Sequence, residues 1–178
     1  MRSVRFLVAA LLVSAFSVVV AAQPQNKNSR PSPPATASVD LAGTTVKIDY
    51  SAPSMRGRKI FGGLQPYDHW WRLGANEATA LTTSGDLDIN GTRVPAGNYT
   101  LFAIPSEGTW KLIVSKATGE WGTLYDPSKD LARIDMKKNA LSSPQEKMSI
   151  TFEHTSGKST QMHARWENTD AWVPVNAK

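Results

Sequence analysis

The sequence predicts an all-β protein: a single antiparallel β-sandwich or barrel-like domain with long loops and little or no helix. Three observations predict it. From Ser38 onwards, apolar and polar residues alternate with a period of two, as in strands that bury one face. Turn sequences rich in Gly, Pro and Asn recur every ~8–12 residues, which is the spacing of all-β sandwiches. No stretch after the N-terminal region has the apolar period of an amphipathic helix.

The clearest local signal is a hairpin. Asn90-Gly91 separates Leu87–Ile89 from Thr92–Val94, and this dipeptide favours a two-residue turn in which both residues have positive φ. An earlier strand is indicated by Val46, Ile48 and Tyr50, whose neighbours in the chain are polar. The pattern predicts that these strands bury one face.

Further strands are expected along the rest of the chain. They are Tyr99–Ile104, Trp110–Ser115, Leu131–Met136, Met148–His154 and Thr160–Trp166. Only residues 127–131 and 144–148, each beginning with proline, are expected to hold a short helical turn. Strands joined by turns, without crossover helices, favour an antiparallel arrangement.

The first 22 residues have the pattern of a signal peptide. Arg2 and Arg5 precede an apolar run from Phe6 to Val20, and Ala21-Ala22 supplies small residues for cleavage. We therefore expect cleavage near Ala22 and a secreted or periplasmic protein without a membrane span after cleavage. The alternative is an uncleaved N-terminal anchor, which would need about 20 apolar residues.

Residues 23–37 are expected to be a disordered, proline-rich linker before a domain that spans residues 38–178. The segment has four prolines and no large apolar residue, so it cannot bury enough surface to offset its ordering entropy. A proline-rich recognition motif is the alternative interpretation.

Composition limits the classes of function. Loss of Arg2 and Arg5 with the signal peptide would leave 18 basic against 15 acidic residues, and no basic patch interleaved with aromatic residues follows, so we expect no nucleic-acid partner. The chain has no cysteine, so its stability has to come from a hydrophobic core instead of disulfides. About 140 residues are enough for one such core.

The stretch from Ser51 to Leu81 concentrates unusual side chains, and the candidate binding residues lie in it: Trp70, Trp71, Arg72, Asn76 and Glu77. Two interpretations stay open. In the first, one tryptophan fills the core, while Arg72 and Glu77 face each other across a turn at Gly74 and form a structural pair. In the second, the other tryptophan and the polar residues line an open cleft that binds a sugar or an apolar ring.

A second, weaker candidate is an anion site. Arg56, Arg58 and Lys59 lie among glycines, and backbone amides freed by glycine near cations bind anions. The alternative is a solvated basic turn, because the spacing of a phosphate-binding loop is absent.

No metal or other cofactor is expected. The three histidines, His69, His154 and His163, are far apart in the chain, and neither H-x-H nor H-E-x-x-H occurs. No serine nucleophile motif of the form G-x-S-x-G occurs either. The catalytic residues, if there are any, are unknown from sequence.

Four separated motifs resemble the DUF2911 family, and Arg30-Pro31-Ser32-Pro33 extends the likeness. The motifs are Arg58–Leu64, Trp71–Thr79, Val94–Pro105 and Trp166–Asn168. The resemblance implies an exported bacterial domain, rich in β-structure, with no assigned function. It brings no catalytic residues with it.

Two classes of function remain. One is a non-enzymatic binding or envelope-associated module that contacts a small molecule, a glycan or an envelope protein. The other is a periplasmic hydrolase-like enzyme that acts on a glycan or small molecule, with Glu77 as acid/base. The oligomeric state is not indicated by the sequence.

Overall fold

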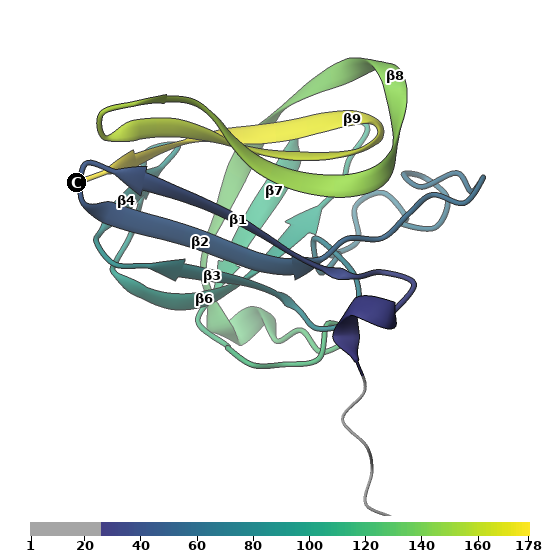
Figure 1. Ribbon diagram of the computed structural model, residues 1–178, viewed down its shortest axis with the longest axis horizontal. Helices are drawn as coiled ribbons and strands as arrows, with labels where there is room; N and C mark the ends of the chain where they lie inside the picture. Colours follow the sequence, from purple (N-terminus) through teal and green to yellow (C-terminus); the bar gives the residue numbers. More distant parts are fainter. Residues whose placement is uncertain (1–25) are drawn as a thin grey trace, which may run out of the picture.

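The structure is a computed structural model that describes residues 26–178 (Figure 1). The described part is all-β, and two single 3₁₀ turns are its only helical segments. The elements are η1 (Lys27–Ser29), β1 (Pro34–Leu41), β2 (Thr44–Ser51), β3 (Thr79–Thr83), β4 (Leu87–Ile89), β5 (Thr92–Val94), β6 (Gly97–Ile104), β7 (Trp110–Ser115), η2 (Pro127–Lys129), β8 (Asp130–Ser156) and β9 (Ser159–Ala177). Within residues 26–178, no helix has the length and apolar character needed to cross a bilayer.

The strands form one antiparallel sheet of nine strands in the order β1-β2-β3-β6-β7-β8-β9-β4-β5. The predicted all-β, antiparallel class is confirmed, but the sheet does not close into a barrel. Instead the sheet bends over itself. The parts of β8 and β9 nearest to the hairpin that joins them lie as a second layer across β1, β2 and β3 (Figure 1). Apolar side chains meet between the two layers.

The second layer exists because β9 reverses direction within its own length. His163 Nδ1 lies 2.9 Å from Asp170 Oδ1, although seven residues of a straight strand would span about 23 Å. The reversal passes through Glu167, whose φ of 53° is left-handed. Because β8 stays paired with β9 from Lys137↔Trp172 to Ser156↔Ser159, β8 follows the same bend, with shifts in register on both sides of Gln145.

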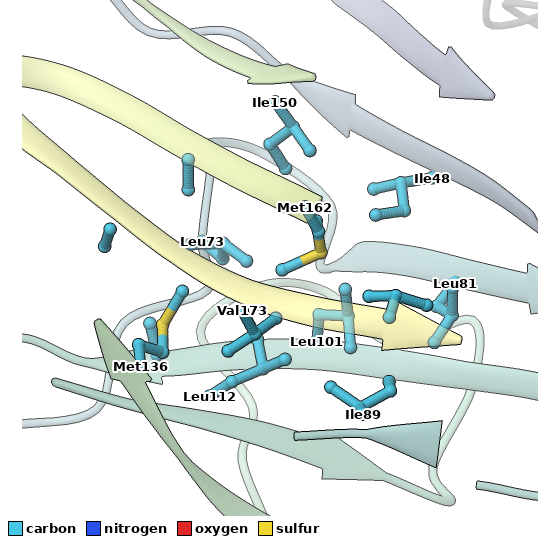
Figure 2. Close-up of a cluster of buried hydrophobic side chains, with 14 of the residues drawn as sticks. Ile48, Leu73, Leu81, Ile89, Leu101, Leu112, Met136, Ile150, Met162 and Val173 are labelled. Carbon is cyan, nitrogen blue, oxygen red and sulfur yellow. The ribbon is translucent and has the colours of Figure 1, made fainter. Parts of the chain in front are cut away.

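The core lies between the layers. Figure 2 shows Ile48 of β2, Leu81 of β3 and Leu101 of β6 facing Ile150 and Met162 from β8 and β9. Each of these side chains is almost completely buried, which contributes about 1.5–3 kcal/mol per large aliphatic residue. A core of this kind is what a chain without cysteine requires.

The predicted hairpin and the nearby strands are confirmed. Asn90 and Gly91 have φ of 45° and 84° and connect β4 to β5, whose bounds match the predicted strands. Asp88 Oδ1 accepts a hydrogen bond from Gly91 N at 2.8 Å. β4 also pairs with the end of β9, through Leu87↔Ala177 and Ile89↔Val175.

Residues 26–37 do not form the expected linker. β1 begins at Pro34, and Pro34–Ala37 pair with β2. Backbone hydrogen bonds to a neighbouring strand order this segment without large apolar side chains, and proline is tolerated because β1 is an edge strand. The expected signal peptide, its cleavage near Ala22 and residues 23–25 of the expected linker lie outside the described residues.

One of the two expected helical turns is present. η2 covers Pro127–Lys129, with Asp126 Oδ1 accepting from Ser128 N at 2.9 Å. Residues 144–148 instead lie in β8. The paired backbone of β8 and β9 overrides the local turn preference of proline there, and the register shifts around Gln145 accommodate it.

Candidate functional site

The two adjacent tryptophans lie in different environments, one in the core and one at the surface. Trp71 is 3% exposed and belongs to the core, where its ring stacks on Trp166 with centroids 5.7 Å apart. Its Nε1 donates to Gly74 O at 3.1 Å. Trp70 is 38% exposed and packs on Phe102, on the outer face of β6, with the two ring planes nearly perpendicular. The expectation that one tryptophan fills the core is therefore confirmed, and that residue is Trp71.

Arg72 and Glu77 do not form the expected pair. Arg72 Nη1 donates to the backbone oxygen of Asn76 at 3.2 Å, while Glu77 accepts from Arg30 Nη1 at 2.9 and 3.1 Å. The turn has left-handed residues at Leu73 and Asn76, with φ of 49° and 56°, and not at Gly74. This path brings a carbonyl to Arg72 and directs Glu77 toward the segment that precedes β1.

Arg30 and Lys27 hold Glu77 as a carboxylate. Lys27 Nζ lies 3.2 Å from Glu77 Oε1. The hydrogen bond from Arg30 is the main cause that lowers the pKa of Glu77 to about 2. Asn76 adds a second tie to the same segment, because its Nδ2 donates to Ser32 O at 3.0 Å.

The basic loop does not present a free anion site. Arg58 donates to Met55 O and Ser54 O at 2.8 and 2.7 Å, and Arg56 Nη2 donates to Pro31 O at 3.3 Å. Both guanidinium groups thus bind the backbone of the protein itself. Lys59 is exposed, and its carbonyl accepts from Leu64 N.

The amides of this loop bind an internal anion. Glu167 accepts from Ile60 N at 2.9 Å and from Phe61 N at 3.3 Å. The sequence predicted that freed amides of this loop would bind an external anion. Two of its amides instead bind a carboxylate of the protein itself, which comes from the reversal of β9, 107 residues further along the chain.

A cleft opens beside Glu77. It has a volume of about 310 Å³ and lies on the outer face of the sheet, over β1, β2, β3 and β6. Lys27, Arg30 and Glu77 border one part, Thr118–Glu120 another, and Asp49 and Asn98 are among the remaining polar groups. The lining combines charges of both signs, the amide of Asn98 and several hydroxyls with apolar side chains such as Ala80. Such a set suits a ligand that has both polar and apolar surface.

An exposed indole adjoins the cleft. Trp121 is 49% exposed and lines a shallow hollow with Arg30 and Asn76, so the two depressions share Arg30. A backbone bridge between Glu77 and Trp121 holds the backbone of Trp121 beside Glu77. Gly122 allows it, because a Cβ at that position would lie 2.4 Å from Arg72 Cδ and 2.6 Å from Asn76 O.

Of the five candidate binding residues, the structure brings Asn76 and Glu77 to this surface. Trp71 lies in the core and Trp70 packs on Phe102. Arg72 donates to the backbone oxygen of Asn76 and so stabilises the turn. Sequence reasoning missed Lys27, Arg30, Glu120 and Trp121. A signal existed for two of them, since Arg30 lies in the motif Arg30–Pro33, and Trp121 is a large apolar residue in a glycine-containing loop.

Two of the histidines that the sequence places far apart meet in space. His154 and His163 have ring centroids 6.3 Å apart on the hairpin of β8 and β9. His69 is exposed in the loop before β3. Spacing in the chain could not show this meeting, because the pairing of β8 with β9 sets it.

The comparisons with known proteins give a family and no activity. A family model described as "Protein of unknown function (DUF2911)" matches residues 32–175, which is most of the chain. The chain matches no curated protein and no solved structure. The matched residues include β1 through most of β9, and with them Asn76, Glu77 and Trp121. The chain therefore belongs to the DUF2911 family.

Proposed function

We propose that this domain is a non-enzymatic binding module, exported to the periplasm or cell exterior, and that it binds a short glycan in the cleft beside Glu77. The observation that carries the proposal is the exposed indole of Trp121 next to a cleft of about 310 Å³ whose lining combines charged and hydroxyl groups with apolar side chains. That volume lies at the lower end of the range of small-molecule sites, ~300–1,000 Å³.

The groups of the cleft suit sugar hydroxyls. Each hydroxyl can donate to a carboxylate of Asp49, Glu77 or Glu120 and accept from Arg30 or Lys27. The apolar face of a sugar ring can pack on the exposed indole, which supplies apolar area at a low cost in conformational entropy. Opposite charges within the lining favour a neutral polar ligand, because a strongly charged one would meet repulsion from one set of side chains.

Glu77 acts in this proposal as a binding group, not as an acid/base. With its pKa lowered to about 2 by Arg30, Glu77 carries no proton to donate near neutral pH. The same hydrogen bonds make it a weak base. Both of its oxygens already accept from Arg30. These contacts argue against the alternative of a hydrolase that uses Glu77.

Export is part of the proposal and is supported by the signal-peptide pattern of residues 1–22. Cleavage after Ala22 would leave the family-matched region, residues 32–175, intact. Mass spectrometry of the protein from the cell exterior or periplasm is expected to show an N-terminus at Gln23. A protein that retains Met1 would contradict this assignment.

Binding is tested on the chain that begins at Gln23. Thermal-shift screening against neutral oligosaccharides, followed by titration calorimetry, is expected to find at least one ligand that raises the melting temperature. Trp121→Ala is expected to weaken its binding at least tenfold without changing the melting temperature of the free protein, because the indole is exposed.

The matched control is Leu124→Ala. Leu124 is 59% exposed on the same loop, but it is not among the residues that line either depression. This variant is expected to bind as the unaltered chain does. A screen in which no glycan binds, or a ligand whose affinity is unchanged by Trp121→Ala, would overturn the glycan proposal; binding of peptides alone would favour an envelope protein as the partner.

A further inference from the structure

A polar cluster lies on the β8–β9 hairpin, in the second layer of the fold. One ligand atom from each of Glu153, His154 and His163 lies within 4.8 Å of those from the other two. His163 is buried, Glu153 is half-buried and His154 is exposed, so the cluster reaches from the protein interior to solvent. None of these residues lines the cleft beside Glu77.

The backbone bends to bring the cluster together. Glu153 and His154 are neighbours in a strand, and neighbouring side chains of a regular strand point to opposite faces. His154 has a φ of 53°, and the register of β8 against β9 shifts between Glu153 and Ser156. This irregularity lets both side chains approach His163. A left-handed conformation at a residue other than glycine costs free energy, and such positions concentrate at functional sites.

His163 is held in the orientation of a metal ligand. Its Nδ1 lies 2.9 and 3.0 Å from the two oxygens of the buried Asp170, and its Nε2 lies 3.2 Å from Gln161 Oε1. Arg165 Nη2 also lies 3.2 Å from Nδ1. In the tautomer that donates from Nδ1 to Asp170, Nε2 has a free electron pair, and Nε2 and Gln161 Oε1 can then face the same metal ion. A carboxylate that orients a histidine through its other nitrogen is a recurrent arrangement around protein-bound metals.

Stacking fixes the ring further. The imidazole of His163 lies against the indole of Trp172 with centroids 5.7 Å apart and an angle of 15° between the planes. Lys137 Nζ lies 4.7 Å above the same indole. The position of His163 is thus determined on three sides, by Asp170, Trp172 and the strand itself, and the ring has little freedom to turn away.

We propose that Glu153, His154 and His163 form a binding site for a divalent transition metal ion of the Zn²⁺ class, separate from the glycan cleft. Two imidazoles and one carboxylate are ligands that such ions prefer. Three protein ligands leave at least one coordination position for water or for Gln161. An open position of this kind distinguishes the site from closed structural sites, in which four protein ligands surround the metal.

Arg165 limits the affinity of the site for a metal ion, because it competes with the metal for Glu153. It binds both oxygens of Glu153, one of them from Nη2 at 2.8 Å, and its Nη2 also lies 3.0 Å from Asp170 Oδ2. In the metal-free protein this guanidinium supplies the positive charge that the cluster of carboxylates needs. Metal binding requires Glu153 to turn one oxygen away from Arg165, while Asp170 keeps the guanidinium in place. We therefore expect a reversible site and not a permanent structural one.

The test uses the mature chain without a histidine tag, freed of metal by a chelator. Titration calorimetry with ZnCl₂ is expected to show one equivalent bound, and Cu²⁺ bound at the same site is expected to give an electron paramagnetic resonance spectrum with nitrogen hyperfine splitting. His154→Asn is the decisive variant, because asparagine tolerates the left-handed backbone at this position. Loss of an orienting partner alone costs about 10–100-fold in metal affinity, so loss of this ligand is expected to cost at least about tenfold.

His69→Ala is the matched control, since it removes an exposed histidine outside the cluster. It is expected to bind Zn²⁺ as the unaltered chain does. Absence of saturable binding up to about 1 mM Zn²⁺ would overturn the proposal. Equal affinity of the His154→Asn variant and the unaltered chain would overturn it too, and so would loss of binding in the His69→Ala control.

Discussion

Arg30 Nη1 lies 2.9 and 3.1 Å from the two carboxylate oxygens of Glu77, which ties the segment before β1 to the loop before β3 across 47 residues of chain. The side chains of the two residues are 21% and 38% exposed. The pair is thus partly screened by solvent, and it stabilises the fold less than a buried pair would.

The first prediction concerns the free energy of this pair. Glu77→Gln is expected to lower the free energy of unfolding in urea by about 1 kcal/mol or less at neutral pH. A double-mutant cycle of Glu77→Gln with Arg30→Gln is expected to give a measurable coupling energy, because the two groups touch. A second cycle, of Glu77→Gln with Arg72→Leu, should give a coupling energy near zero, since Arg72 binds the carbonyl of Asn76 and not Glu77. Coupling to Arg72 and not to Arg30 would contradict the observed contacts.

The second prediction concerns pH. The folded-state pKa of Glu77 is lowered from 4.5 to about 2, chiefly by Arg30. A carboxyl group with a lowered pKa stabilises the fold above its unfolded-state pKa, and this contribution is lost as pH falls through the folded-state value. Urea unfolding at pH 5, 4 and 3 should therefore show that the free energy of unfolding falls as the pH is lowered. The decrease per pH unit should be smaller for Glu77→Gln. Identical slopes would mean that the pKa of Glu77 is the same in both states.

The third prediction concerns the N-terminal segment. Deletion of residues 23–33 is expected to lower the melting temperature, because it removes Arg30 from Glu77, Ser32 O from Asn76 and Pro33 O from Ala52 N. Each kcal/mol lost corresponds to about 2–4 °C for a domain of this size. Differential scanning calorimetry of the two chains decides between an ordered segment and a linker: an unchanged melting temperature would mean that residues 26–33 add nothing to stability.

The fourth prediction concerns the internal anion. Glu167→Ala leaves the amides of Ile60 and Phe61 without their acceptor beside two buried side chains, and is expected to cost about 1–3 kcal/mol in urea unfolding. Glu107→Ala, an exposed acid in a turn, is the control. Added sulfate is expected to restore part of the lost stability to Glu167→Ala beyond its effect on the control. Equal effects of sulfate on both variants would show that the loop does not bind anions.

Local signals in the sequence predicted local structure well. Asn90-Gly91 gave the hairpin with its strand bounds, because positive φ at both positions is a property of those two residues and needs no distant partner. Trp110–Ser115 likewise emerged at its observed bounds. The alternation of Val46 and Ile48 identified a strand with one buried face.

Pairings between distant segments were the part that sequence could not supply. The residues around Glu77 in the sequence do not indicate that its partner is Arg30, 47 residues away, rather than the nearby Arg72. Residues 34–37 are ordered because their backbone forms hydrogen bonds with β2, and the composition of the segment does not reveal this pairing. The meeting of His154 with His163 depends on the register of two long strands, one of which reverses at Glu167.

The last residues of β9 pair with β4, through Leu87↔Ala177 and Ile89↔Val175, and β4 in turn holds the edge strand β5. The chain must close a loop of about 90 residues before this part of the sheet can form, and such long-range closure is slow compared with local hairpin formation. Strands β1, β2, β3, β6 and β7 pair with one another without β9, whereas β4 and β5 join the rest of the sheet only through it. The edge formed by β4 and β5 is thus expected to be the last part of the sheet to form.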